Sequence, residues 1–226
     1  MDLEFKIEPE KLGRTLARVI AALGALYVIT QFPVRVLGWS NKILWIAAFD
    51  LNRELSLPSV YSSAAILLCA GLLAWTAARE RARSRPFVGW AGMSAVFAFL
   101  AADELLALHE KLNDPLRAAL QTSGGVLHYA WVIPYLVLAV GFAAVYLPFL
   151  LRLPTRTRKL FVISGIAFAG GAVGCELIGN FIMKDAPPFS VLMGVEILCE
   201  EMLEMSGIAL FAYAIADYGR VSEASR

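Results

Sequence analysis

The segment E-I-L-C-E-E-M-L-E-M-S-G, residues 196–207, carries four glutamates inside an apolar run long enough to cross a membrane. Glu196, Glu200 and Glu204 recur every four residues, so they lie along one face of a helix. A charged side chain in mid-membrane costs about 2.5–3.5 kcal/mol on insertion scales. Because this helix accepts that cost several times, its carboxylates require protons, cations or water as partners.

The composition indicates an integral membrane protein. Of the 226 residues, 59% are hydrophobic, and the mean hydropathy is +0.66. A soluble domain has roughly 45–50% apolar residues. The net charge of +1 gives no indication of nucleic-acid binding, and three cysteines in apolar runs argue against a disulfide framework. The charged first residues lack a signal-peptide layout, so we expect the first apolar segment to be a retained span.

Six apolar segments predict an all-α fold, a bundle of six transmembrane helices that forms one domain over residues 1–226. The predicted spans are 16–34, 58–78, 87–109, 126–151, 160–183 and 191–216. Trp39 and Trp45, in the connection after the first span, predict a short interfacial helix before the second. Gly170 and Gly174 are four apart in the fifth span, as are Gly171 and Cys175, so we expect a neighbouring backbone to pack closely there.

The distribution of Lys and Arg predicts the orientation of these spans. Arginine-rich clusters occupy residues 79–85 and 152–159, and further basic residues precede the first span. The positive-inside rule then places both termini and both basic loops in the cytoplasm. We therefore expect a bacterial inner-membrane protein whose other three loops face outward.

The acids and both histidines gather in the outer halves of the last four spans. This layer contains Asp103, Glu104, His109, Glu110, His128, Glu176, Asn180, Glu196, Glu200, Glu201 and Glu204. The same segments hold no Lys or Arg, because Lys111, Arg117 and Lys184 lie in the loops. So many carboxylates at one depth cannot all be ionised alone, so either several are protonated or metal ions lie among them.

Carboxylates with one or two imidazoles are ligands of Fe, Mn or Zn, and helical bundles build such sites from inward-facing Glu and His. The sequence thus predicts one or two divalent ions held by Asp103, Glu104, His109, Glu110, Glu176, Glu200 and Glu204. His128, Asn180, Glu196 and Glu201 are expected as supporting or interfacial residues. Copper is disfavoured, because Met and Cys in apolar helices usually serve packing.

Some details leave the ligand geometry open. Asp103 and Glu110 are seven apart and share a stripe on a regular helix, whereas His109 points elsewhere. The Glu-x-x-His pair of soluble di-iron bundles is absent, so the pattern favours a metal without specifying two ions. Asp50, Arg53 and Glu54 are interpreted as a solvated surface, with a lip over the site as the alternative.

Three segments carry a resemblance. They are F-D-L-N-R-E-L-S-L-P-S-V-Y-S-S, D-E-L-L-A-L-H-E and E-E-M-L-E-M-S-G, the last two with the patterns D-E-x4-H-E and E-E-x2-E-x2-G. They resemble recurring pieces of uncharacterised bacterial six-span integral membrane proteins. The resemblance covers most of the chain and implies no particular activity.

Three functions remain open at this stage. The favoured hypothesis is a metal-dependent hydrolase or oxidase that acts on a lipid-soluble or periplasmic substrate. The alternative is a proton or divalent-cation transporter that uses the same carboxylates, but the apolar inner half of the third span argues against a conducting path. A third is an accessory subunit or sensor. Membrane lipid is the expected partner, nucleic acid is not, and nothing in the residues defines an oligomer.

Overall fold

The computed structural model describes residues 7–121, 130–183, 186–187 and 189–224, and all their regular secondary structure is helical. Nine α-helices are described, together with a short 3-10 turn, Glu110–Leu112, and a π-helical stretch, η3, at Gly170–Cys175. The α-helices are α1 Pro9–Leu37, α2 Leu44–Ala47, α3 Leu57–Ala82, α4 Val88–Leu106, α5 Asn113–Leu120, α6 Val132–Arg152, α7 Thr155–Ala169, α8 Glu176–Met183 and α9 Val191–Ala224.

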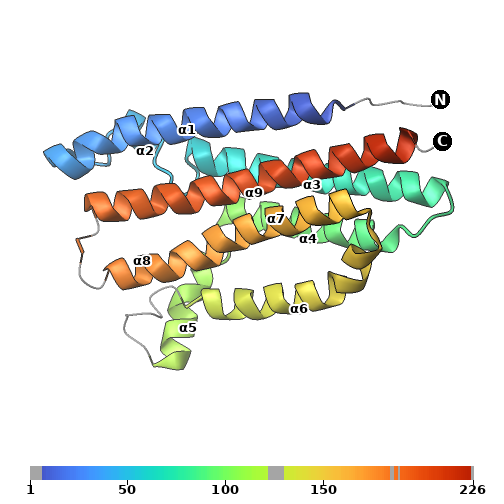
Figure 1. Cartoon of the computed structure of the whole chain (residues 1–226). Helices are drawn as coiled ribbons and strands as arrows, with labels where there is room; N and C mark the ends of the chain where they lie inside the picture. The colour runs from blue at the N-terminus through green and yellow to red at the C-terminus, as the bar shows by residue number, and fades with distance from the viewer. Residues whose placement is uncertain (1–6, 122–129, 184–185, 188, 225–226) are drawn as a thin grey trace.

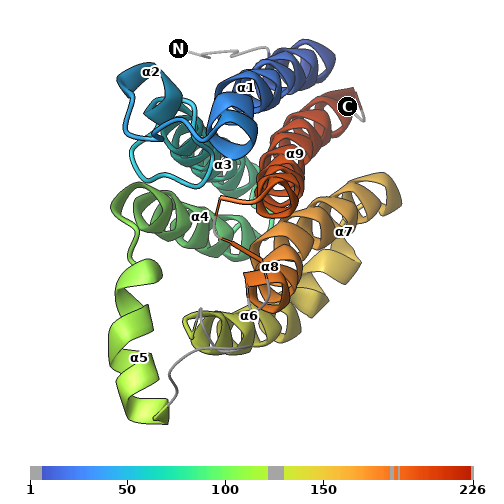
Figure 2. The same ribbon diagram turned by 90° about the vertical axis from the view of Figure 1, so that its left-hand side faces the viewer.

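The long helices alternate in direction along the bundle. In Figure 1, α1, α4 and the continuous α7–η3–α8 segment run toward the end that carries α2 and α5, and α3, α6 and α9 run back. Both chain termini therefore lie at one end, here called the terminal end. The opposite end, with α2, α5 and the start of α9, is called the distal end. Figure 2 views the bundle from the distal end.

Five helical segments are long and apolar enough to cross a membrane: α1, α3, α4, α6 and Thr155–Gly179. They overlap the first five predicted spans, and α2 occupies the place of the predicted short interfacial helix. The predicted third span is too long, because α4 ends at Leu106 and not at residue 109. The start of the predicted fourth span falls partly on residues 122–129, outside the described part, and α6 begins at Val132.

The sixth predicted span corresponds to α9, the longest helix described. It packs against α1, α3 and α7, so it lies in the middle of the bundle (Figure 2). It does not reach the apolar content of the other five, because its sequence includes the four glutamates and Asp217.

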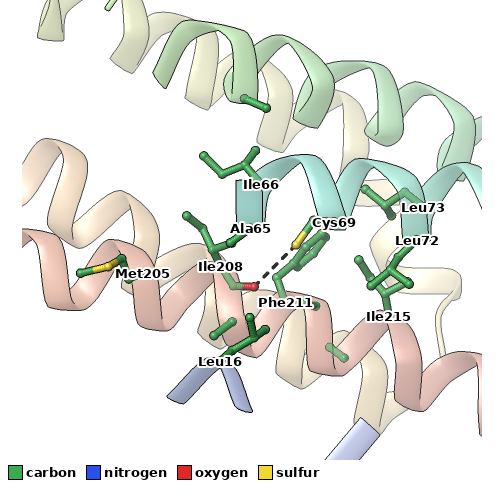
Figure 3. Packing of buried hydrophobic residues seen from close by; sticks show 14 of the residues in the cluster. Leu16, Ala65, Ile66, Cys69, Leu72, Leu73, Met205, Ile208, Phe211 and Ile215 are labelled. Carbon is green, nitrogen blue, oxygen red and sulfur yellow. Dashed lines mark hydrogen bonds between the residues drawn. The ribbon is translucent and has the colours of Figure 1, made fainter. Parts of the chain in front are cut away.

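Apolar side chains fill the space between α3 and α9. Cys69 and Leu73 on α3 and Met205 and Ala212 on α9 are fully buried. Figure 3 shows the two helices meeting through these layers, where the Cys69 thiol donates to the carbonyl oxygen of Ile208 at 3.7 Å. The part of α9 that follows the glutamates is therefore held in a closely packed core.

Two glycines allow α9 to approach α7 and η3 closely. A Cβ added at Gly207 would lie 2.7 Å from the backbone nitrogen of Phe168, and one at Gly171 would lie 2.7 Å from the carbonyl oxygen of Glu200. The expectation of close packing is thus confirmed for Gly171. It is wrong for Gly170 and Gly174, which have no described atom within 4 Å of an added Cβ. The π-helical turn changes which glycine faces the neighbour.

Candidate metal centre

Carboxylates from α4, α8 and α9 converge at the distal end. Five of them form what we call the carboxylate cluster: Glu104, Glu176, Glu200, Glu201 and Glu204. Glu201 lies within electrostatic range of Glu104 and Glu176, and so does Glu204. Glu200 lies within range of Glu176, Glu201 and Glu204. These side chains therefore lie close enough to influence one another's charge, although no three of them bring ligand atoms as close together as the group formed by Glu54, His109 and Glu110.

The cluster has no lysine or arginine partner within the described part of the chain. All five glutamates are half-buried, and no ion pair joins any of them to a described Lys or Arg. The carboxyl group of Glu176 lies near that of Glu200 and near Trp131. The arrangement thus requires protons or another positive charge.

His109 is positioned by the early end of α4. Ala107 adopts a left-handed conformation at φ 47°, which ends the helix and turns the chain back over it. The backbone nitrogen of His109 then donates to Oδ1 of Asp103 at 3.0 Å, and its Nδ1 lies 3.1 Å from Oδ2. Because α4 ends at Leu106, Asp103 and Glu110 do not share a helical face as the sequence suggested.

Asp103 is occupied as a hydrogen-bond acceptor. It is buried, and Oδ1 also accepts a hydrogen bond from the hydroxyl of Tyr135 at 2.8 Å. Because a carboxylate accepts hydrogen bonds, the neutral ring of His109 carries its proton on Nδ1, next to Oδ2 of Asp103, and keeps a free lone pair on Nε2. This is the arrangement in which a carboxylate orients a metal-binding histidine. Asp103, expected from the sequence as a metal ligand, is thus placed where it holds the imidazole of His109.

Aromatic rings and charge surround His109. Its ring centroid lies 4.8 Å from that of Trp131 and 6.1 Å from that of Tyr135. Burial lowers the pKa of His109, but the hydrogen bond to Asp103 and the charges of Asp103, Glu104 and Glu110 outweigh it, so the pKa lies above its usual 6.5. The neighbouring acids thus favour a cation at this position.

Glu54, His109 and Glu110 form a closer group. One ligand atom from each of the three lies within 4.8 Å of the others, closer together than in any other described set of His, Cys, Asp and Glu. Oε2 of Glu54 is buried and has no hydrogen-bond partner among the described residues. Burial and the charge of Glu110 raise the pKa of Glu54. We call these three residues the entrance triad.

The sequence analysis interpreted Glu54 as part of a solvated surface, with a lip over the site as the alternative. The residue is partly exposed, but its Oε2 is buried close to His109 and Glu110, so each interpretation fits in part. The position of Glu54 in the chain, two residues before Ser56, could have indicated its place near the site. Ser56 caps α3, because its side-chain oxygen accepts a hydrogen bond from the backbone nitrogen of Ser59. That cap begins α3 at the distal end (Figure 1), and Glu54, two residues earlier, lies within electrostatic range of Glu104 and Glu201.

The remaining expected site residues are placed less centrally or not described. Glu196 is 8% exposed and packs against Gly179, where an added Cβ would lie 2.9 Å from its Oε1. That Oε1 has no hydrogen-bond partner among the described residues. Asn180 lies in α8, but its side chain is outside the described part, as is the whole of His128.

These features define a class: a helical bundle suited to a membrane, with carboxylates and a histidine collected at one end. The chain belongs to the family described as a domain of unknown function, DUF8692, whose sequence model matches residues 16–217. The match extends from α1 into the last third of α9, so the family covers all the helices that carry the candidate site. No curated protein and no solved structure matches the chain.

Proposed function

We propose that this protein is a six-span integral membrane protein that binds one or two divalent ions, Fe, Mn or Zn, at its distal end. It acts as a metal-dependent hydrolase or oxidase on a lipid-soluble or periplasmic substrate. The entrance triad is the observation that carries the proposal, because its ligand atoms lie within 4.8 Å of one another. Both termini are cytoplasmic in this proposal, and the distal end faces outward.

The exposed face of α9 supports its role as a sixth span. Val195, Cys199 and Leu203 are exposed and recur every four residues, so they form one apolar stripe. The glutamates of the same segment face the carboxylate cluster instead. A helix that presents apolar side chains outward and acids inward can lie in a bilayer without exposing charge to lipid.

Each residue of the centre has a distinct role in the proposal. Nε2 of His109 and the carboxylates of Glu54 and Glu110 hold the ion, and Asp103 and Tyr135 fix the imidazole. The carboxylate cluster behind them accepts a second ion or exchanges protons with the substrate. A bound ion supplies Lewis-acid chemistry if it is Zn or Mn and redox chemistry if it is Fe.

The core argues for an enzyme in preference to a transporter. Between the glutamates of α9 and the terminal end, Met205, Phe211 and Ile215 are buried against α3 (Figure 3). A conducting path would have to cross this apolar layer. We therefore expect no metal or proton flux into proteoliposomes that contain the protein.

Elemental analysis of protein purified without chelator tests the proposal. We expect one or two ions per chain in the wild type and a loss of metal in His109→Gln and Glu110→Gln. Asp114→Asn is the matched control, because this nearby acid is 96% exposed. It should retain the full metal content. If the wild type holds only trace metal, even after loading with Fe, Mn and Zn, the proposal fails.

A further inference from the structure

A second polar feature lies at the distal end, on the other side of α9 from α8. A cavity of about 640 Å³ opens between α1, the segment 41–53 and the start of α9. Its volume is in the range of ligand sites in proteins, about 300–1,000 Å³. The described charged residues that line it are three cations, Arg35, Lys42 and Arg53, and one acid, Asp50. The cavity is thus positive, in contrast to the carboxylate cluster beside it.

Two buried donors in this cavity lack acceptors. Gln31 lines the cavity and is only 3% exposed, yet its Nε2 has no hydrogen-bond partner among the described residues. The Nε of Arg35, one helical turn later, is also buried without a partner. A buried donor left unpaired is destabilising, because it has lost its hydrogen bonds to water without gaining others. Such groups are expected where a ligand supplies the acceptor.

Arg35 is held in place by the protein. Its Nη1 donates to the carbonyl oxygen of Ser190 at 2.8 Å, and its Nη2 donates to the hydroxyl of Tyr27 at 3.1 Å. The first bond joins α1 to the segment that leads into α9, and the second lies within α1. A fixed guanidinium needs no reorganisation to receive an anion, and its fork geometry suits phosphate and carboxylate.

The cavity borders the outer apolar face of α1. Phe32 and Val36, each next to a cavity residue, are 56% and 53% exposed. Phe189 and Ile197 add apolar surface to the lining itself. A ligand with a polar head and an apolar tail would therefore find donors inside and lipid-facing side chains outside.

We infer that this cavity binds the anionic head group, a phosphate or a carboxylate, of an amphiphilic molecule whose tail lies against α1. The inference deepens the proposed function and rests on it, because it names the class of substrate. Asp50, in the cavity lining, lies within electrostatic range of Glu201. The head group would thus be held beside the carboxylate cluster, and the adjoining part of the molecule would reach the metal centre.

The test is equilibrium binding to detergent-purified protein from which metal has been removed by chelator. The probes are short-chain phosphatidylglycerol, short-chain phosphatidylcholine and inorganic phosphate. The main variant combines Lys42→Gln with Arg53→Gln, two exposed side chains whose loss leaves the fold intact. Gln31→Leu removes the buried donor. Arg14→Gln combined with Arg18→Gln is the matched control, because it also removes two positive charges from exposed side chains, in the terminal half of α1.

We expect phosphatidylglycerol to bind and phosphatidylcholine not to bind. The double variant and Gln31→Leu should weaken binding at least about tenfold, and the control should not. If inorganic phosphate binds and the same variants weaken its binding, the anion site is supported, with free phosphate as its ligand in place of a lipid head group. If neither anionic probe binds, or if the variants leave binding unchanged, the inference is overturned.

Metal content of the same preparations separates this inference from the proposed function. The double variant should retain its metal, because Lys42 and Arg53 lie outside the entrance triad and the carboxylate cluster. Anion binding by a protein that never holds metal would contradict only the proposed function. Metal binding without any anion binding would contradict only the inference.

Discussion

The acids at the two ends of the bundle differ in whether arginines of the chain pair with them. At the terminal end, Asp217 is 1% exposed and accepts hydrogen bonds from Arg156 at 2.7 Å and Arg220 at 2.8 Å. Glu80, also buried there, lies 3.7 Å from Arg83. At the distal end, the carboxylate cluster has no described Lys or Arg partner.

The difference separates structural acids from acids that need an external partner. Glu204 and Asp217 lie on the same helix, so the helix itself does not decide which of them is paired. Of the arginines that neutralise Asp217 and Glu80, Arg156 and Arg85 belong to the basic clusters of the terminal end, and Arg220 lies one turn after Asp217 on α9. At the terminal end, arginines of the chain balance the charges of Asp217 and Glu80. At the distal end, the carboxylate cluster requires protons or metal to balance its charge.

The largest expected effect concerns Asp103. In Asp103→Asn the shape is kept, but the negative acceptor that orients His109 is lost, so metal affinity should fall about 10–100-fold. Titration of the metal-free protein with Zn²⁺ or Mn²⁺ measures this. Glu80→Gln, a buried acid of the terminal end, should leave affinity unchanged. An equal loss in both variants would mean that the effect comes from general destabilisation.

Neutralising one acid at each end should change stability in opposite directions. Asp217→Asn weakens two charge-assisted hydrogen bonds and should lower the free energy of unfolding by about 1–2 kcal/mol. Glu204→Gln removes a carboxyl group that is buried among other acids, so the folded protein no longer bears the cost of desolvating or protonating it, and the stability of the metal-free protein should rise by on the order of 1 kcal/mol. Thermal unfolding in detergent, with chelator present, compares them. Destabilisation by Glu204→Gln would show that this glutamate is a structural acid like Asp217.

The next effect tests whether close packing sets the geometry of the cluster. A Cβ at Gly171 would meet Cγ of Glu204 at 2.6 Å as well as the α9 backbone, so Gly171→Ala should destabilise by about 1 kcal/mol and weaken metal binding. Gly170→Ala meets nothing described and should be neutral or slightly stabilising, because alanine favours the helix. Equal effects of the two substitutions would contradict a role for the close contact.

The helices were predictable because their signal is local. Each of the six apolar segments overlaps a long helix or, in the fifth, the continuous α7–η3–α8 segment. Short connections make successive helices run in opposite directions. That alternation alone was enough to predict that the acids gather at one end of the bundle. That alternation brings residues far apart in sequence, such as Glu104 and Glu201, to one end of the bundle.

The details of the centre depend on features without a local signal. Ala107 takes a left-handed conformation that normally favours glycine or asparagine, so nothing in the sequence marks the end of α4 there. The π-helical turn shifts the helical phase at Gly171. Glu54 joins His109 only through tertiary packing of the loop before α3. The sequence therefore allowed us to predict which acidic residues lie near the centre, but not which residues each of them contacts.

The smallest expected effect is a pH dependence confined to the distal end. Since the pKa of His109 lies above its usual 6.5, the folded state favours the protonated ring. Its contribution to stability is present below that value and is lost as the pH rises through the folded pKa. In metal-free protein, His109→Gln should therefore destabilise by a few tenths to about 1 kcal/mol more at about pH 6 than at about pH 8.

Asp217→Asn provides the contrast for that measurement. Arginine and aspartate ordinarily stay charged between about pH 6 and pH 8, so its destabilisation should be the same at both. Unfolding of both variants and the wild type at each pH gives the two differences directly, and the comparison cancels the titration of the other acids. A pH-independent effect of His109→Gln would mean that the bond to Asp103 does not favour the imidazolium. The distal end would then lack the preference for a cation that the neighbouring acids imply.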